Sequence, residues 1–217
     1  SLMSRRPVWT MLGEKLPATI ELSIFAMIFA LGVGLTAGVL AAWKQNSIID
    51  YLSSMVALIG ISMPIYWLGF MLILLFSVQL NILPTSGRLP AEINADLFST
   101  NFFFFESLFT GNWQVFFACV KHMILPAIAL GTIPMAIIAR MTRSSLLEVL
   151  RQDYMRTARA KGLNFFNLFI HAIKNAAIPI ITVFGMQFGR FMGGAVLTET
   201  VFSWPGMGKW LLDGIYK

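Results

Sequence analysis

The chain has 217 residues, of which 57% are hydrophobic and 12% are charged, and its formal net charge is +6. A water-soluble globule of this size could not bury so much apolar surface in one core, so lipid must be its main solvent. Because Cys119 is the single cysteine, the chain cannot form an intramolecular disulfide or a cysteine-based metal cluster. We expect Cys119 to act as a small apolar residue in the core or facing lipid.

Four hydrophobic stretches predict an all-α membrane protein, a polytopic helix bundle. The expected spans are about 19–43, 52–80, 118–140 and 176–198, each long enough to cross a bilayer core of about 30 Å. Pro64 interrupts the second stretch, and Pro126 and Pro134 lie in the third. Membrane helices tolerate such prolines, which are either static bends or kinks in helices that move.

The placement of basic residues predicts the orientation. Seven of the sixteen Lys and Arg residues lie between 140 and 174, whereas the connector 81–121 carries only Arg88 and Lys121. Because cytoplasmic loops are enriched in Lys and Arg, the first segment should face the cytoplasm and the second should face outward. The N-terminal Arg5, Arg6 and Lys15 fit this topology poorly, and an additional upstream span would resolve the tension. Charge concentrated in a loop does not predict a nucleic-acid partner.

The outer connector is rich in aromatic residues. Pro84–Gly87 predicts a turn, and Phe102–Phe105, Trp113 and Phe116–Phe117 follow it. Aromatic rings concentrate at the membrane interface, so this segment should lie at the level of the outer headgroups. A role in contacting substrate is the alternative.

Glycines at four-residue spacing predict close helix packing inside the membrane. Gly185, Gly189 and Gly193 form a tandem set in the fourth span, typical of tight packing against a partner helix, in this or a second subunit. Gly34 and Gly38 form one such pair, which is too common to carry weight alone.

Arg190 is a cation within the fourth span. Insertion of such a residue at the bilayer centre costs on the order of 3 kcal/mol, so it should face protein or water. It either lines a translocation path or reaches the outer interface, where it could pair with Glu199.

No catalytic or metal-binding residues are predicted. His122 and His171 lie in different regions, and neither an HExxH nor a GxSxG pattern occurs. The nearest approach to a phosphate-binding loop, Gly206–Trp210, lacks the first glycine and has Trp210 where a hydroxyl must bind magnesium. Any use of ATP must therefore depend on another polypeptide.

The basic segment 140–174 predicts two helices and a turn. Helix-forming residues run through about 145–161, Gly162 is a plausible helix end, and Asn164 can cap a second helix over about 164–174. The second helix has an apolar stripe that includes Leu168 and Phe169. Such a rigid element could transmit movement from a cytoplasmic partner, and a loop that binds lipid headgroups is the alternative.

This segment also resembles a known family. Tyr154-x-x-Thr157-Ala158-Arg159-Ala160-Lys161-Gly162-Leu163, followed by His171 and Asn175-Ala176-x-x-Pro179, is similar to the coupling loop of ABC importer permeases, and more narrowly to that of the dipeptide/oligopeptide/nickel branch. Matching stretches occur in family order at Leu16–Leu22, Leu83–Arg88, His122–Ala127 and Thr198–Gly206. Arg156-Thr157-Ala158 replaces the general Glu-Ala-Ala pattern, as is usual in the peptide branch, and Arg190 lies outside the branch pattern.

The resemblance implies a type I ABC importer transmembrane domain covering 1–217, without the first and last of six spans, in which 141–175 is the ATPase-coupling loop. The coupling residues it implies are Tyr154, Thr157, Ala158, Arg159, Ala160, Lys161, Gly162, Leu163, Asn175 and Pro179.

The same resemblance implies partners and a location. The partners are a second permease subunit, two ATPase subunits, a periplasmic substrate-binding protein and the lipid bilayer, with no nucleic acid. This chain would bind no cofactor itself, since ATP and magnesium belong to the ATPases. It would be a multi-pass protein of the bacterial inner membrane that imports dipeptides or related small peptides. An energy-independent channel or pore and a purely structural assembly subunit are the alternatives, and haem or a metal chelate remains open as cargo.

Overall fold

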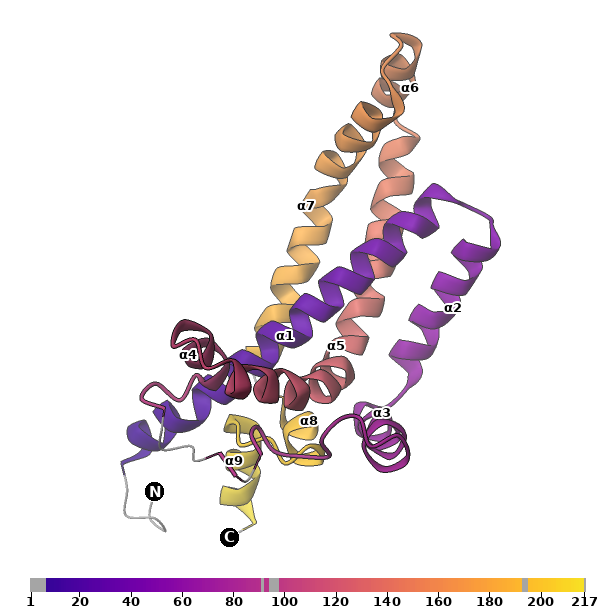
Figure 1. Cartoon of the computed structure of the whole chain (residues 1–217). Coiled ribbons are helices and arrows are strands. Elements are labelled where there is room, and N and C mark those ends of the chain that lie inside the picture. Colours follow the sequence, from indigo (N-terminus) through magenta and orange to yellow (C-terminus); the bar gives the residue numbers. More distant parts are fainter. Residues whose placement is uncertain (1–6, 91, 94–97, 193–194, 217) are drawn as a thin grey trace. The chain divides into compact units, whose positions relative to one another are not determined.

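The computed structural model describes residues 7–90, 92–93, 98–192 and 195–216, except for the side chains of Phe165 and Met192. Within these residues the secondary structure is helical, which confirms the all-α expectation. The helices, shown in Figure 1, are α1 (Val8–Trp43), α2 (Ile48–Ser62), α3 (Ile65–Leu72), the π-helix η1 (Ile73–Gln79), α4 (Phe103–Phe109), α5 (Trp113–Leu150), α6 (Asp153–Ala160), α7 (Phe165–Met192), α8 (Val196–Val201) and α9 (Met207–Ile215).

Three of the described helices, α1, α5 and α7, are long and apolar enough to cross a membrane. The number rises to four if α2 and the α3–η1 pair form one broken span. The break falls at Pro64, as the sequence predicts, because proline has no N–H to continue the helix. Pro64 is the extended residue immediately before α3.

Two helices extend beyond the expected membrane spans. Helix α1 begins at Val8, before the span expected from 19, and α5 runs from Trp113 to Leu150, on both sides of the expected 118–140. The added segments 8–18 and 141–150 contain charged residues, so hydropathy alone does not predict that the helices continue there. The fourth span was expected to reach 198, but α7 ends at Met192 and Thr198 belongs to α8.

The chain forms two compact units built from alternating segments. Unit 1 contains 1–26, 64–130 and 190–217, and unit 2 contains 27–63 and 131–189. In unit 1, Leu125 and Ala129 of α5 form a buried cluster with Phe202.

In unit 2, helices α1 and α5 approach each other closely. A Cβ atom added to Gly34 would lie 2.7 Å from the backbone oxygen of Met135, and one added to Gly38 would lie 2.5 Å from that of Ala139. Side chains do not fit at these distances, so glycine lets the two backbones meet. Gly34 and Gly38, whose spacing alone was too common to predict a contact, therefore form a packing motif between α1 and α5.

Helix α2 is joined to α5 at two points. Near the start of α2, the two carboxylate oxygens of Asp50 accept hydrogen bonds of 2.5 and 2.7 Å from Arg143. Near its end, a Cβ atom added to Gly60 would lie 3.1 Å from the methyl carbon of Thr132. The two contacts lie about 15 Å apart along α2, given the rise of a helix.

The substitution Gly38→Leu should destabilise the protein, because the new side chain would overlap the backbone of α5. Overpacking of this kind costs about 1–3 kcal/mol. Gly32→Leu is the matched control, since an added Cβ on this glycine of the same helix meets nothing within 4 Å. Thermal unfolding of the purified full-length protein in detergent measures both variants, and equal melting temperatures would contradict the packing role of Gly38.

Candidate functional site

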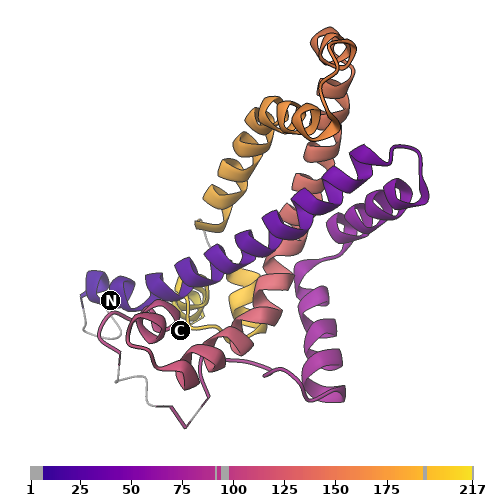
Figure 2. The same cartoon turned by 45° about the horizontal axis from the view of Figure 1, so that its top comes forward.

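The short helix α6 lies at the tip of unit 2, where α5 ends and α7 begins (Figures 1 and 2). One residue anchors it: Met155 is fully buried, in a cluster that includes Leu146 of α5 and Leu168 and Ala172 of α7. Because both neighbouring helices contribute to this cluster, a displacement of α6 bears on the ends of both. We call residues 153–163 the docking segment, after the role that the sequence resemblance predicts for them.

Most other side chains of the docking segment are exposed. Tyr154, Thr157, Arg159, Ala160 and Lys161 are exposed. Ala158 and Leu163 are half-buried, and Arg156 is 76% exposed and forms only a loose ion pair with Asp153, at 3.7 Å. Exposed ion pairs of this kind contribute little to stability. The outer face of α6 is therefore a basic, solvated surface, and the buried Met155 on the opposite face attaches the helix to its neighbours.

A glycine turn ends the docking segment. Gly162 has a φ of +78°, a backbone conformation that suits glycine, and its N–H donates to the backbone oxygen of Arg159 at 3.0 Å. The side-chain oxygen of Asn164 then accepts a hydrogen bond from Asn167 N–H at 2.9 Å, which caps α7. Both the glycine turn and the asparagine cap confirm the sequence predictions.

Two boundaries in this region were predicted wrongly. The helix expected over 145–161 is interrupted at Arg151–Gln152, so that α5 ends at Leu150 and α6 starts at Asp153. Gln152 is extended (ψ 148°), which turns the chain so that Met155 faces inward. The second helix expected over 164–174 is not separate, because it continues as the first turns of α7.

The structure brings only part of the predicted coupling set together. Residues 154–163 share one short element, whereas Asn175 and Pro179 lie within α7, about 15 and 21 Å along the helix from its first residue at the usual rise. The Asn175 side chain is exposed and donates to the backbone oxygen of His171 at 2.8 Å.

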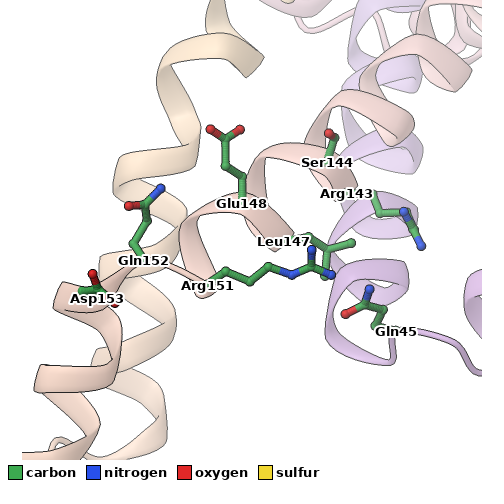
Figure 3. Close-up of a pocket in the computed structure, with 8 residues that line it drawn as sticks. All are labelled: Gln45, Arg143, Ser144, Leu147, Glu148, Arg151, Gln152 and Asp153. Carbon is green, nitrogen blue, oxygen red and sulfur yellow. The ribbon is translucent and has the colours of Figure 1, made fainter.

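A polar hollow of about 550 Å³ lies beside the docking segment (Figure 3). It is lined by the end of α5, the start of α6 and Gln45 from the turn after α1. Arg151 extends across it toward Gln45, and Glu148 points away from Arg151 (Figure 3). With arginines and carboxylates around an open hollow, this surface suits contact with a polar protein face rather than enclosure of a small molecule.

The sequence missed a buried ion pair in unit 1. Arg88 forms a 2.5 Å salt bridge with Glu21, and the same guanidinium donates to the backbone oxygen of Asn101 at 2.8 Å. The second carboxylate oxygen of Glu21 accepts the N–H of Phe104 at 3.0 Å, and Arg88 stacks 4.1 Å from the ring centre of Phe103. The sequence places Glu21 and Arg88 in two separate stretches that match the family, and nothing in it indicates that these residues, 67 positions apart, form an ion pair.

A second buried carboxylate, Glu199, organises the residues after α7. It accepts hydrogen bonds from the hydroxyl of Thr19 at 2.7 Å and from the N–H of Lys209 at 2.9 Å. Close by, the indole N–H of Trp204 donates to the backbone oxygen of Ala18 at 2.9 Å. The stretches around 16–22 and 198–206, which carry much of the family resemblance, therefore meet in space and serve the fold of unit 1.

The tandem glycines of α7 show no close packing partner within the described chain. A Cβ atom on Gly185 or Gly189 would meet no described atom within 4 Å, and Gly193 lies outside the described residues. Arg190 is exposed in the last turn of α7, where a cation suits the helix dipole. The partner helix and the translocation path both remain predictions. Among the described residues, no group of His, Cys, Asp and Glu side chains could hold a metal ion.

The outer connector contains a carboxylate held by a short loop. Glu106 in α4 accepts hydrogen bonds from the backbone N–H and the hydroxyl of both Ser99 and Thr100, at 2.6–3.0 Å. These donors, with the Thr100 hydroxyl first, lower the pKa of Glu106 to about 2. Phe109 is 84% exposed beside this loop, which fits the expected position at the membrane interface.

Comparisons with known proteins identify the kind of chain. The family described as "Binding-protein-dependent transport system inner membrane component" matches residues 34–217. The chain is 54% identical to the di/tripeptide transport system permease protein DppB of Pseudomonas aeruginosa (strain UCBPP-PA14), over 100% of this chain and 65% of the relative. It is 51% identical to the dipeptide transport system permease protein DppB of Escherichia coli (strain K12), with the same coverage of both chains. The chain thus spans about 65% of the length of these relatives.

Replacing Met155 by alanine should release α6 from its support. The lost burial and the resulting cavity cost about 2–5 kcal/mol for a fully buried methionine. Hydrogen exchange across residues 153–163 of the full-length protein should therefore accelerate, while α1 stays protected. Arg156→Ala, which removes an exposed side chain from the same helix, is the control. Equal exchange in the two variants would contradict the anchoring role.

The titration of Glu106 gives a second test. Because the folded pKa of about 2 lies below the ordinary value of 4.5, its contribution to stability is complete above about pH 4.5 and is lost as the pH falls through 2. Carbon-13 NMR of the labelled carboxyl group should show a midpoint near pH 2. Thr100→Val should raise this midpoint, and Thr110→Val should not, since the Thr110 hydroxyl bonds only to backbone oxygens. A midpoint near 4.5 in the unchanged protein would refute the loop geometry.

Proposed function

Because this chain belongs to the family of binding-protein-dependent transport system inner membrane components, we propose that it acts as a permease subunit that imports dipeptides or related small peptides. Two relatives support the cargo, because the di/tripeptide and the dipeptide permeases match the whole chain at more than half identity. The helices long enough to span a membrane support the location.

Import is driven by separate ATPase subunits that dock on residues 153–163. The observation that carries this proposal is the arrangement of α6: the buried Met155 and the half-buried Ala158 pack against a cluster with residues of α5 and α7, while most of its other residues are exposed. An element that is rigidly supported yet almost wholly exposed suits contact with a protein partner. The polar hollow lined by Gln45 and Arg151 widens the same surface. ATP and magnesium would be bound by those partners.

Docking can be converted into movement of the spans because α6 is inserted between two helices. A shift of α6 acts through Met155 on Leu146 and on Leu168, which belong to α5 and α7. Two discrete arrangements of these helices, biased by the docked partner, would switch the side of the membrane from which cargo is accessible.

The remaining partners occupy other surfaces. A second permease subunit would pack on the open glycine face of α7, at Gly185 and Gly189, where side-chain-free backbone is exposed within the described chain. A periplasmic binding protein would deliver the peptide to the outer side, which carries the connector with α4.

The substitution Gly162→Pro should uncouple ATP hydrolysis from uptake. Proline fixes φ near −65°, whereas Gly162 has a φ of +78° and donates its N–H, so the turn that ends the docking segment cannot form. In proteoliposomes with the full-length transporter, peptide uptake per ATP hydrolysed should fall markedly, because ATP hydrolysis continues while the movement of the docked partner no longer reaches the spans.

Gly111→Pro is the matched control for this variant. Gly111 also has a positive φ, +71°, and open space around it, but it lies in the outer connector. It should leave the ratio of uptake to hydrolysis unchanged, and insertion of both variants into the membrane should be normal. Unchanged uptake in Gly162→Pro would overturn the docking role, and uptake without any ATPase would favour the alternative of an energy-independent channel.

A further inference from the structure

An apolar crevice of about 400 Å³ separates α2 from α1 and α5 within unit 2. Small and aliphatic side chains form most of its wall, among them Ala37, Ala41, Ala57, Leu58, Ile61 and Ala139. Arg140 and Arg143 also line it, and both lie where the basic cytoplasmic segment begins.

The crevice follows from the way α2 is attached. The helix is fixed to α5 by the ion pair of Asp50 with Arg143 near one end and by the approach of Gly60 to Thr132 near the other. Between these points the facing residues include Ala57 and Ala139, whose side chains are too short to fill the space. The cavity is thus a consequence of two fixed ends and small residues between them.

The two arginines at the crevice differ in their electrostatic state. Arg143 is neutralised by a bidentate pair with the buried Asp50. Arg140 is exposed and has no ion pair within the described part of the chain. It also follows the uncharged stretch between Lys121 and Arg140, and the positive-inside bias predicts that this end of the stretch faces the cytoplasmic leaflet.

We propose that the crevice binds an anionic phospholipid of the cytoplasmic leaflet, with an acyl chain between α2 and α5 and the phosphate on Arg140. The apolar wall offers too few partners for water, and a basic residue at the mouth of a cavity between membrane helices attracts an anionic headgroup. The crevice holds about 400 Å³, and one turn of a helix about 10 Å wide already occupies roughly that volume. A further helix therefore does not fit, whereas a flexible acyl chain does. The crevice shares Arg143 with the polar hollow beside α6, but Arg140 and the apolar wall are not part of that hollow.

Native mass spectrometry of the purified full-length transporter, titrated with phosphatidylglycerol or with phosphatidylcholine of the same chains, tests the site. Phosphatidylglycerol should bind more tightly, and Arg140→Gln should weaken its first binding step about fivefold, which corresponds to about 1 kcal/mol per basic residue near the surface. Ser53→Phe, which places a ring at the crevice wall, should weaken both lipids. Lys174→Gln removes a cation of the same basic segment away from the crevice and should have no effect.

A photoreactive p-benzoylphenylalanine at Leu58, which lines the crevice and is 64% exposed, identifies the occupant directly. Cross-linking to lipid supports the proposal. Cross-linking to another polypeptide, equal affinity for the two lipids, or unchanged binding in both Arg140→Gln and Ser53→Phe would overturn it.

Discussion

The ion pair between Asp50 and Arg143 is the interaction on which unit 2 depends. It joins the start of α2 to the part of α5 that also carries Leu146, the support of α6. Removing Arg143 would leave the buried carboxylate of Asp50 without its partner, whereas the Arg143 side chain is 31% exposed and can be solvated if Asp50 is removed. The pair therefore holds the start of α2 beside the part of α5 that precedes the docking segment, and it also fixes one end of the apolar crevice.

Unit 1 also contains buried carboxylates that are satisfied by polar partners. Glu21 and Glu199 are fully buried, and hydrogen bonds from Arg88, Thr19 and backbone N–H groups satisfy their carboxylates. Lipid is as apolar as leucine, so helices in a membrane gain little from hydrophobic association and depend on close packing and polar contacts. Such contacts have strict geometry, and they give a largely apolar chain a defined arrangement.

The sequence predicts the helices, the break at Pro64 and the turn at Gly162 because these depend on local chemistry. It fails where tertiary contacts decide. The end of α5 at Leu150 depends on Met155 turning inward, and hydropathy does not encode that contact. Likewise, spacing alone cannot tell which glycines meet another helix: Gly38 does, whereas no described atom lies near Gly185. The buried carboxylates of Glu21 and Glu199 were missed because their partners, Arg88 and Thr19, lie far away in the sequence.

Met155 is the one fully buried residue of α6, so the other positions of this helix can change with little loss of stability. Substitutions at exposed positions usually change stability by no more than about 0.5 kcal/mol, whereas those at a buried residue cost several times more. Under the proposed docking of ATPases, recognition and folding would be assigned to different residues of one eight-residue helix. Duplicated copies of such a gene could then diverge on the outer face of α6 and acquire distinct partners while the membrane helices keep their packing.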